Sequence, residues 1–198
     1  MDQVGRSIES DYEKGQVLGA IQPRHLENDA VRQAFVRAAR TMSSDYEKRQ
    51  VLSKVLAAGK PSQVVTTAML DLASTIDSDY EVTELLIGLA KTGTVTGAED
   101  PAYLKALGTI ESDYEKHRAL AALFASGPRP HATVAAALEA ATTIGSDYEL
   151  ASFLVELAEK GLITKDLRPL FRRALDTIES QYERQRALAA LGAKDVDI

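Results

Sequence analysis

Cysteine and tryptophan are both missing from the 198 residues of this chain. Without Cys there are no disulfides and no thiolate-bound zinc sites, and the redox compartment is left open. No apolar run approaches the roughly 18 residues that a membrane-spanning helix needs. The opening residues Met1–Arg6 carry no apolar signal-peptide core. We therefore expect no direct membrane insertion.

Basic segments are missing as well, since the formal net charge is −6 and there is no run of like charges. A nucleic-acid backbone attracts a clear surplus of Lys and Arg, so we expect no nucleic-acid partner. The only histidines, His25, His117 and His131, fall at unrelated positions, and we interpret each as a solvated surface residue.

Motifs of common enzymes are also lacking. The sequence has no His-Glu-x-x-His pattern, no Gly-rich phosphate loop and no Gly-x-Ser-x-Gly elbow. We therefore predict no catalytic activity, no metal and no cofactor.

What the chain does contain is a repeated tetrad, Ser-Asp-Tyr-Glu. Five copies and a sixth, Ser-Gln-Tyr-Glu, follow one another at steps of 34 residues and open at Ser10, Ser44, Ser78, Ser112, Ser146 and Ser180. Ser-x-x-Glu is a capping box, in which the Ser side chain accepts the N–H three residues on and the Glu reaches back to the Ser N–H. Asp in the first turn complements the helix dipole.

Each tetrad is expected to open a helix, and we call these six the B helices. Apolar residues stand seven, eight and eleven positions after every tetrad Ser, which is the spacing of one helical face. Fifteen positions after four of the serines stand glycines suited to a left-handed C-terminal cap: Gly59, Gly93, Gly127 and Gly161. The first B helix should end early, at Gln22-Pro23.

A second helix is expected between successive B helices, and we call these five the A helices. Their predicted ranges are 27–41, 62–75, 101–109, 131–143 and 166–177, with the third the shortest. Only a Thr-Ile type of connection separates each A helix from the next tetrad, so the two should form an antiparallel hairpin with the Ile or Met filling the bend.

Such hairpins cannot bury their apolar faces alone and have to stack on one another. The sequence therefore predicts an all-α fold, an α-solenoid of stacked antiparallel helix pairs with a 34-residue period. It also predicts a single repeat domain over residues 1–198, with units opening at about 10, 44, 78, 112, 146 and 180.

The period resembles that of tetratricopeptide repeats over the whole chain, although Trp is absent and Tyr opens the helix here. Asp29–Ala34 resembles the Asp-x-Val-Arg pattern of HEAT repeats once. The unit Ile-x-Ser-Asp-Tyr-Glu is similar to bacterial 34-residue helical hairpin repeats attached to bacterial membrane metallopeptidase sensors. This resemblance implies a regulatory context in the bacterial cytoplasm or in an extracytoplasmic segment of a larger protein. The metal motif of the peptidase itself is absent.

Capping does not explain the tyrosine, for which there are two interpretations. We favour packing of each Tyr against the neighbouring unit, with its hydroxyl bonded to a backbone carbonyl or to the next Asp. In the alternative, Tyr and Asp line a groove that holds an extended peptide or a partner helix, since Tyr is favoured at binding hot spots. The candidate partner-binding residues are then Asp45, Tyr46, Asp79, Tyr80, Asp113, Tyr114, Asp147 and Tyr148.

These patterns favour a non-enzymatic scaffold that binds a protein or peptide. The alternative is a sensory or spacer segment of a larger bacterial signalling or regulatory membrane protein. A weaker third hypothesis is an all-α hydrolase or lyase. Because the repeats lack clearly polar end caps, end-to-end self-association is a further hypothesis.

Overall fold

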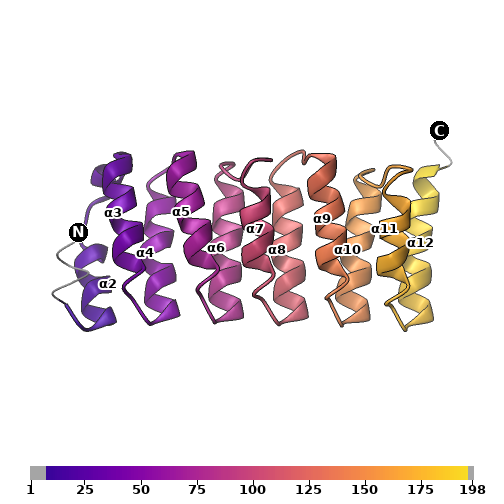
Figure 1. Ribbon diagram of the computed structural model, residues 1–198, viewed down its shortest axis with the longest axis horizontal. Coiled ribbons are helices and arrows are strands. Elements are labelled where there is room, and N and C mark those ends of the chain that lie inside the picture. Colours follow the sequence, from indigo (N-terminus) through magenta and orange to yellow (C-terminus); the bar gives the residue numbers. More distant parts are fainter. Residues whose placement is uncertain (1–7, 196–198) are drawn as a thin grey trace. The chain divides into compact units, whose positions relative to one another are not determined.

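The computed structural model describes residues 8–195, and all regular structure among them is helical (Figure 1). Eleven α-helices and one 3-10 helix occur in this part of the chain, with no strand. The predicted all-α fold class is thereby confirmed. The chain divides into two compact units, Met1–Ile110 and Glu111–Ile198, each of which is described by itself. The single domain and the solenoid stay predictions.

The B helices begin directly after the tetrad Ser, as predicted. In the first unit they are α2 (Asp11–Gly19), α4 (Asp45–Ala57) and α6 (Asp79–Lys91). In the second unit they are α8 (Asp113–Ala125), α10 (Asp147–Glu159) and α12 (Gln181–Asp195). Helix α2 is shorter than the others, and a 3-10 helix, η1 (Pro23–Glu27), follows it. The early end predicted at Gln22-Pro23 is confirmed, because Pro begins the next helical turn and does not extend α2.

The glycines at the ends of four B helices have the predicted conformation. Their φ angles lie between 66° and 140° in Gly59, Gly93, Gly127 and Gly161. No other described residue has a positive φ. A residue with a Cβ is strained in this region, so glycine lets the chain turn sharply into the next A helix.

The A helices lie within a few residues of the predicted ranges. They are α3 (Asp29–Ala39), α5 (Gln63–Ala73) and α7 (Asp100–Leu107) in the first unit, and α9 (His131–Ala141) and α11 (Arg168–Leu175) in the second. One detail was wrong, because α7 was expected to be the shortest A helix and α11 is equally short. The Thr164 hydroxyl donates to Asp166 Oδ1 over 2.6 Å, and this local bond favours a turn at the point where the helix was expected to start.

Each bend from an A helix into the next B helix is closed by a Thr and a buried apolar residue. Thr75, for example, donates its hydroxyl to the carbonyl of Leu72 over 2.7 Å, and Ile76 after it is buried. The same apolar position is buried in the other bends, at Met42, Ile110, Ile144 and Ile178. The predicted filling of the bend is confirmed.

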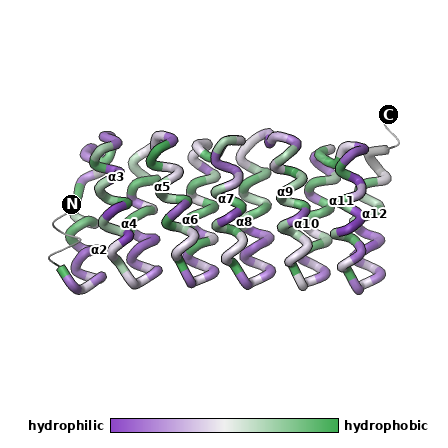
Figure 2. Tube along the Cα trace, in the orientation of Figure 1, coloured by the Kyte–Doolittle hydropathy of each residue, from purple (hydrophilic) through white to green (hydrophobic). Residues whose placement is uncertain are grey.

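Helices of one kind pack side by side within each unit. In the first unit α4 lies between α2 and α6, and α5 lies between α3 and α7; in the second, α10 lies between α8 and α12, and α9 packs on α11. Hydrophobic and hydrophilic segments alternate along the tube (Figure 2). The predicted apolar face is buried in α4, α6, α8 and α10, as at Val51, Leu52 and Val55, whereas α2 and α12 expose part of it. This face and the A helices form the core of each unit.

Candidate binding surface on the B helices

The tetrad serine caps all six B helices. Its Oγ accepts the N–H of the glutamate three residues on, over 3.3–3.5 Å. The expected return bond from Glu to the Ser N–H was wrong at Ser44, Ser78, Ser146 and Ser180. Their N–H groups donate to an aspartate of the preceding repeat.

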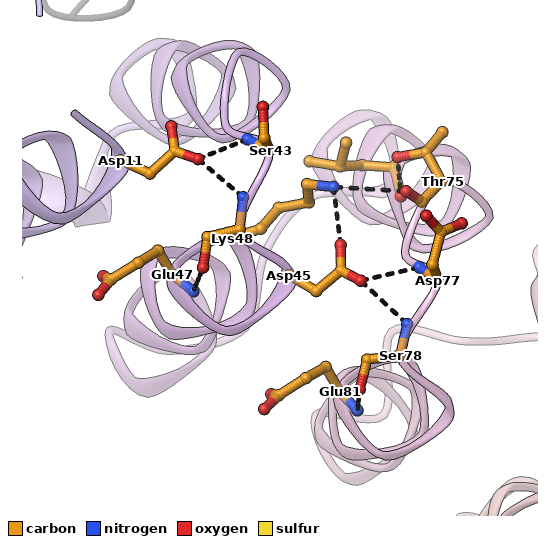
Figure 3. Close-up of polar contacts among 11 residues, drawn as sticks. Asp11, Ser43, Asp45, Glu47, Lys48, Thr75, Asp77, Ser78 and Glu81 are labelled. Atoms are coloured by element: carbon orange, nitrogen blue, oxygen red, sulfur yellow. Dashed lines mark hydrogen bonds and ion pairs between the residues drawn. The ribbon is translucent and has the colours of Figure 1, made fainter. Parts of the chain in front are cut away.

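The tetrad aspartate therefore links neighbouring repeats. Asp45 Oδ2 accepts the backbone N–H groups of Asp77 and Ser78, both over 2.9 Å (Figure 3). Equivalent pairs of bonds, 2.6–3.1 Å long, join the following repeat to Asp11, Asp113 and Asp147. A carboxylate held by two backbone donors caps the next helix and fixes its position, which gives a physical reason for Asp to recur beside Ser.

A buried lysine completes this link in several repeats. Lys48 Nζ donates to Asp45 Oδ1 over 3.1 Å and to the carbonyl of Thr75 over 3.3 Å (Figure 3). Lys14 and Lys116 are buried at the same repeat position and donate to the corresponding Thr carbonyls. Each lysine thus ties a B helix to the bend that opens the next repeat.

The charge of the aspartate is favoured by these contacts. Burial raises the pKa of Asp11, but hydrogen bonds from the N–H groups of Ser44 and Ser43 and from Lys14 outweigh it. The net effect holds the pKa of Asp11 below its ordinary value of 3.8. This carboxylate is therefore ionised at neutral pH, and its hydrogen bonds stabilise the folded protein.

Two of the tetrad glutamates face a cation on the preceding B helix. Glu81 pairs with Arg49, and Glu149 Oε2 lies 2.6 Å from His117 Nδ1. Arg49 and His117 both stand five residues after their own tetrad Ser. An ion pair between this position and the next glutamate thus recurs, once in each unit.

The six tetrad tyrosines are exposed. Between 53% and 73% of each is accessible to solvent, so the favoured interpretation, packing between repeats, was wrong. The hydroxyl of Tyr46 accepts from Gln50 Nε2 over 2.8 Å, on its own helix. Because α2, α4 and α6 lie side by side, Tyr12, Tyr46 and Tyr80 form one row, and Tyr114, Tyr148 and Tyr182 form another on α8, α10 and α12. We call these the tyrosine rows.

Arginines lie against three of these rings. The guanidinium carbons of Arg49, Arg118 and Arg186 are 5.2–5.7 Å from the ring centroids of Tyr46, Tyr114 and Tyr148. Cation–π contacts of this kind hold a ring in a fixed orientation while its edge stays accessible. The rows are therefore partly pre-organised.

A hollow lies between α2 and α4 in the first unit. It has a volume of about 500 Å³, and its lining includes Tyr12, Gly15, Gln16, Tyr46 and Glu47. Glycine at position 15 leaves the space open.

His117 was expected to be solvated, and this was wrong. Only 15% of its side chain is accessible, and its ring lies edge-on to Phe153. Nδ1 faces Glu149 over 2.6 Å, and Nε2 faces Glu156 Oε1 over 3.3 Å. Burial lowers the pKa of His117, but its hydrogen bonds to Glu156 and Glu149 outweigh burial and raise it above 6.5.

The predicted site residues thus have two different environments. Asp45, Asp113 and Asp147 are half-buried and bonded to the next repeat, whereas Tyr46, Tyr80, Tyr114 and Tyr148 face solvent. Asp79 is half-buried as well. Sequence reasoning missed the lysine link, the glutamate pairs and the hollow. The lysine link could have been inferred from the recurring Asp-x-x-Lys spacing, which places the two side chains as an i, i+3 pair on a helix.

The fold and this surface define an all-helical protein with a repeated, tyrosine-bearing helix face. Comparisons with protein-family models, with curated proteins and with solved structures found no match. Within residues 8–195, no three His, Asp or Glu side chains are grouped so as to hold a metal ion. No helix in the described part of the chain has the length and apolar character to cross a bilayer.

Proposed function

We propose that this protein is a non-enzymatic repeat scaffold that holds an extended segment of a partner protein along its tyrosine rows. In this proposal the helix pairs stack as an α-solenoid with a 34-residue period. Successive rings are then one helix apart, about 8–10 Å at ordinary helix spacing.

One observation carries the proposal: the same large side chain is exposed at the same place in every repeat. Tyr contributes a rigid apolar ring and a hydroxyl at little cost in conformational entropy, and it is enriched at binding hot spots. The hydrogen bonds and ion pairs that link the repeats use the tetrad Ser, Asp and Glu and do not need the tyrosine ring. A spacer segment would not need an exposed aromatic residue in each repeat.

A library of random linear peptides displayed on phage tests the proposal. Peptides selected on the parent should bind about tenfold or more weakly when Tyr12, Tyr46 and Tyr80 are all changed to Ser. The control is Val64→Ser, which removes an equally exposed apolar residue from α5, outside the row. If no peptide is enriched, or if enriched peptides ignore the Tyr changes, the scaffold proposal fails and the spacer alternative gains.

A further inference from the structure

The position five residues after the tetrad Ser carries a cation in only two of the five B helices that precede another one. Thr83 and Ala151 stand at this position before Glu115 and Glu183, and these two glutamates pair with Arg118 and Arg186 of their own helices. Arg49 faces Glu81 and His117 faces Glu149, whereas Gly15 stands at the corresponding position before Glu47. No ion pair to Glu47 occurs among the described residues. Glu47 Oε2 lies directly over Gly15, where the Cβ of any larger residue would meet it. Unlike Glu81, Glu115, Glu149 and Glu183, Glu47 therefore has its carboxylate without a paired cation.

The hollow between α2 and α4 lies beside this glycine and this carboxylate, which both belong to its lining. Two aromatic rings, Tyr12 and Tyr46, border it, and the side-chain amides of Gln16 and Gln50 add hydrogen-bonding groups. A second hollow of about 410 Å³ shares part of the lining and extends along α4 past Ser53 and Lys54. Of the described residues that line the two hollows, only Lys54 is cationic, and it belongs to the second.

This set of groups suits a positively charged side chain. A carboxylate accepts from a guanidinium in two parallel bonds, and a tyrosine face attracts the same cation. The protein already holds its own guanidinium groups over tyrosine rings, at 5.2–5.7 Å. Charge complementarity agrees, because the formal net charge of the chain is −6.

We propose that this hollow binds an arginine side chain of the partner segment, whose guanidinium pairs with Glu47 and lies against Tyr12 or Tyr46. The partner thus supplies the cation that Arg49 and His117 supply within the chain. This inference rests on the proposed scaffold function and specifies the chemistry of its partner at one repeat.

The test is an NMR titration in which the blocked tripeptide Gly-Arg-Gly is added to the full isotope-labelled chain. The amide signals of Gly15, Glu47 and Gln50 should shift with the probe. The same peptide with citrulline, which is neutral and nearly isosteric with arginine, should shift them at least about tenfold more weakly.

Two variants and a control locate the interaction. Glu47→Gln should weaken binding at least about tenfold, and Gly15→Arg, which places an internal guanidinium beside Glu47, should abolish it while the protein unfolds at no lower temperature. Glu13→Gln removes the same charge from the same tetrad position on the exposed first turn of α2 and should leave binding unchanged.

Three outcomes would overturn the inference. Equal binding of the citrulline peptide, or retained binding in Glu47→Gln, would show that the carboxylate does not select a cation. Shifts of the same signals on concentrating the protein without probe would identify a second copy as the occupant. The last outcome is that no signals shift, although library peptides without basic residues still need the tyrosine row for binding. This result would overturn the inference and leave the scaffold proposal standing.

Discussion

At the scale of single residues, Asp and Tyr of the tetrad are neighbours in sequence with opposite surroundings. Successive residues of a helix point about 100° apart, so one can face the next repeat while the other faces solvent. Asp45 is bonded to the next bend, and Tyr46 carries more than half of its surface in solvent. The aspartate therefore contributes to stability, whereas the tyrosine contributes to the exposed surface.

This assignment predicts the effect of removing a tyrosine ring. Tyr46→Ala should lower the free energy of unfolding by about 1 kcal/mol or less, because it removes an exposed ring and one cation–π contact. Tyr103→Ala should cost about 3–5 kcal/mol, because Tyr103 is fully buried in α7. Chemical denaturation of both variants measures the difference. A similar loss at Tyr46 would mean that the ring is part of the packing.

Removing the tetrad aspartate, in contrast to the tyrosine, is expected to lower stability strongly. Asp45→Ala should cost about 2–4 kcal/mol, since it leaves the N–H groups of Asp77 and Ser78 without an acceptor and removes the carboxylate that pairs with the buried ammonium of Lys48. Asp71→Ala, at an exposed position of α5, is the control and should change stability by less than about 0.5 kcal/mol. Equal, small effects of both in urea denaturation would refute the inter-repeat link.

At the scale of helices, glycine has two distinct uses. Gly15 lies inside α2 with an ordinary helical conformation, whereas Gly59 follows α4 with a φ of 117°. The first lies in the lining of the hollow between α2 and α4, and the second turns the chain. The same substitution should therefore act in opposite directions at the two sites.

Gly15→Ala should stabilise the protein by about 0.5–1 kcal/mol through helix propensity, because the atom it meets is the movable end of the Glu47 side chain. Gly59→Ala should destabilise it by about 1–2 kcal/mol, because the positive φ disfavours any Cβ although the surrounding space is open. Thermal unfolding monitored by circular dichroism separates the two. Destabilisation by Gly15→Ala would show that Glu47 is fixed in place.

The contact between α8 and α10 depends on pH through His117. Its folded-state pKa is raised, so the charged form stabilises the folded protein below pH 6.5, and this contribution is lost as pH rises through the raised value. We expect stability to fall by about 1–3 kcal/mol over that window, the size of a hydrogen bond to a charged group.

His117→Gln should remove this decline, and His25→Gln, at an exposed position in η1, should keep it. The measurement is the free energy of unfolding of the full chain at a series of pH values. A decline that persists without His117 would assign it to another group.

At the scale of the whole molecule, the first and last B helices expose residues whose equivalents elsewhere are buried. Val17 on α2 is 43% exposed and Leu188 on α12 is 45% exposed. The equivalent residues Val51 and Leu52 on α4 are 3% and 0% exposed. Apolar surface of this kind favours association between copies, and such a head-to-tail contact would not close on itself.

End-to-end association predicts that the mass measured by light scattering rises with protein concentration. Leu188→Glu should reduce this rise, because it places a charge on one of the two exposed apolar faces. Val64→Glu changes an exposed residue on α5 instead and should have no effect. A constant monomer mass over a wide concentration range would reject the hypothesis.

Much of the local structure could be predicted from the sequence because its causes are local. Ser caps, glycine C-caps and the spacing of apolar residues act within about four residues of one another, so the B helices began and ended where expected. That α11 is as short as α7 was not predicted, because the bond from Thr164 to Asp166 competes with the first turn of the helix.

The sequence by itself determined an all-helical chain, its capped helices and its recurring tetrad. Only the tertiary structure decided that the side of the B helices opposite the apolar face is open, and so placed the tyrosines in solvent. It also decided that Asp11, Asp45, Asp113 and Asp147 are bonded to the next bend. It also paired His117 with Glu149 and Glu156 and left Glu47 facing a glycine. The physical reason is that these contacts join residues about one repeat apart, and they depend on how neighbouring helices are rotated about their own axes, which the local pattern does not specify.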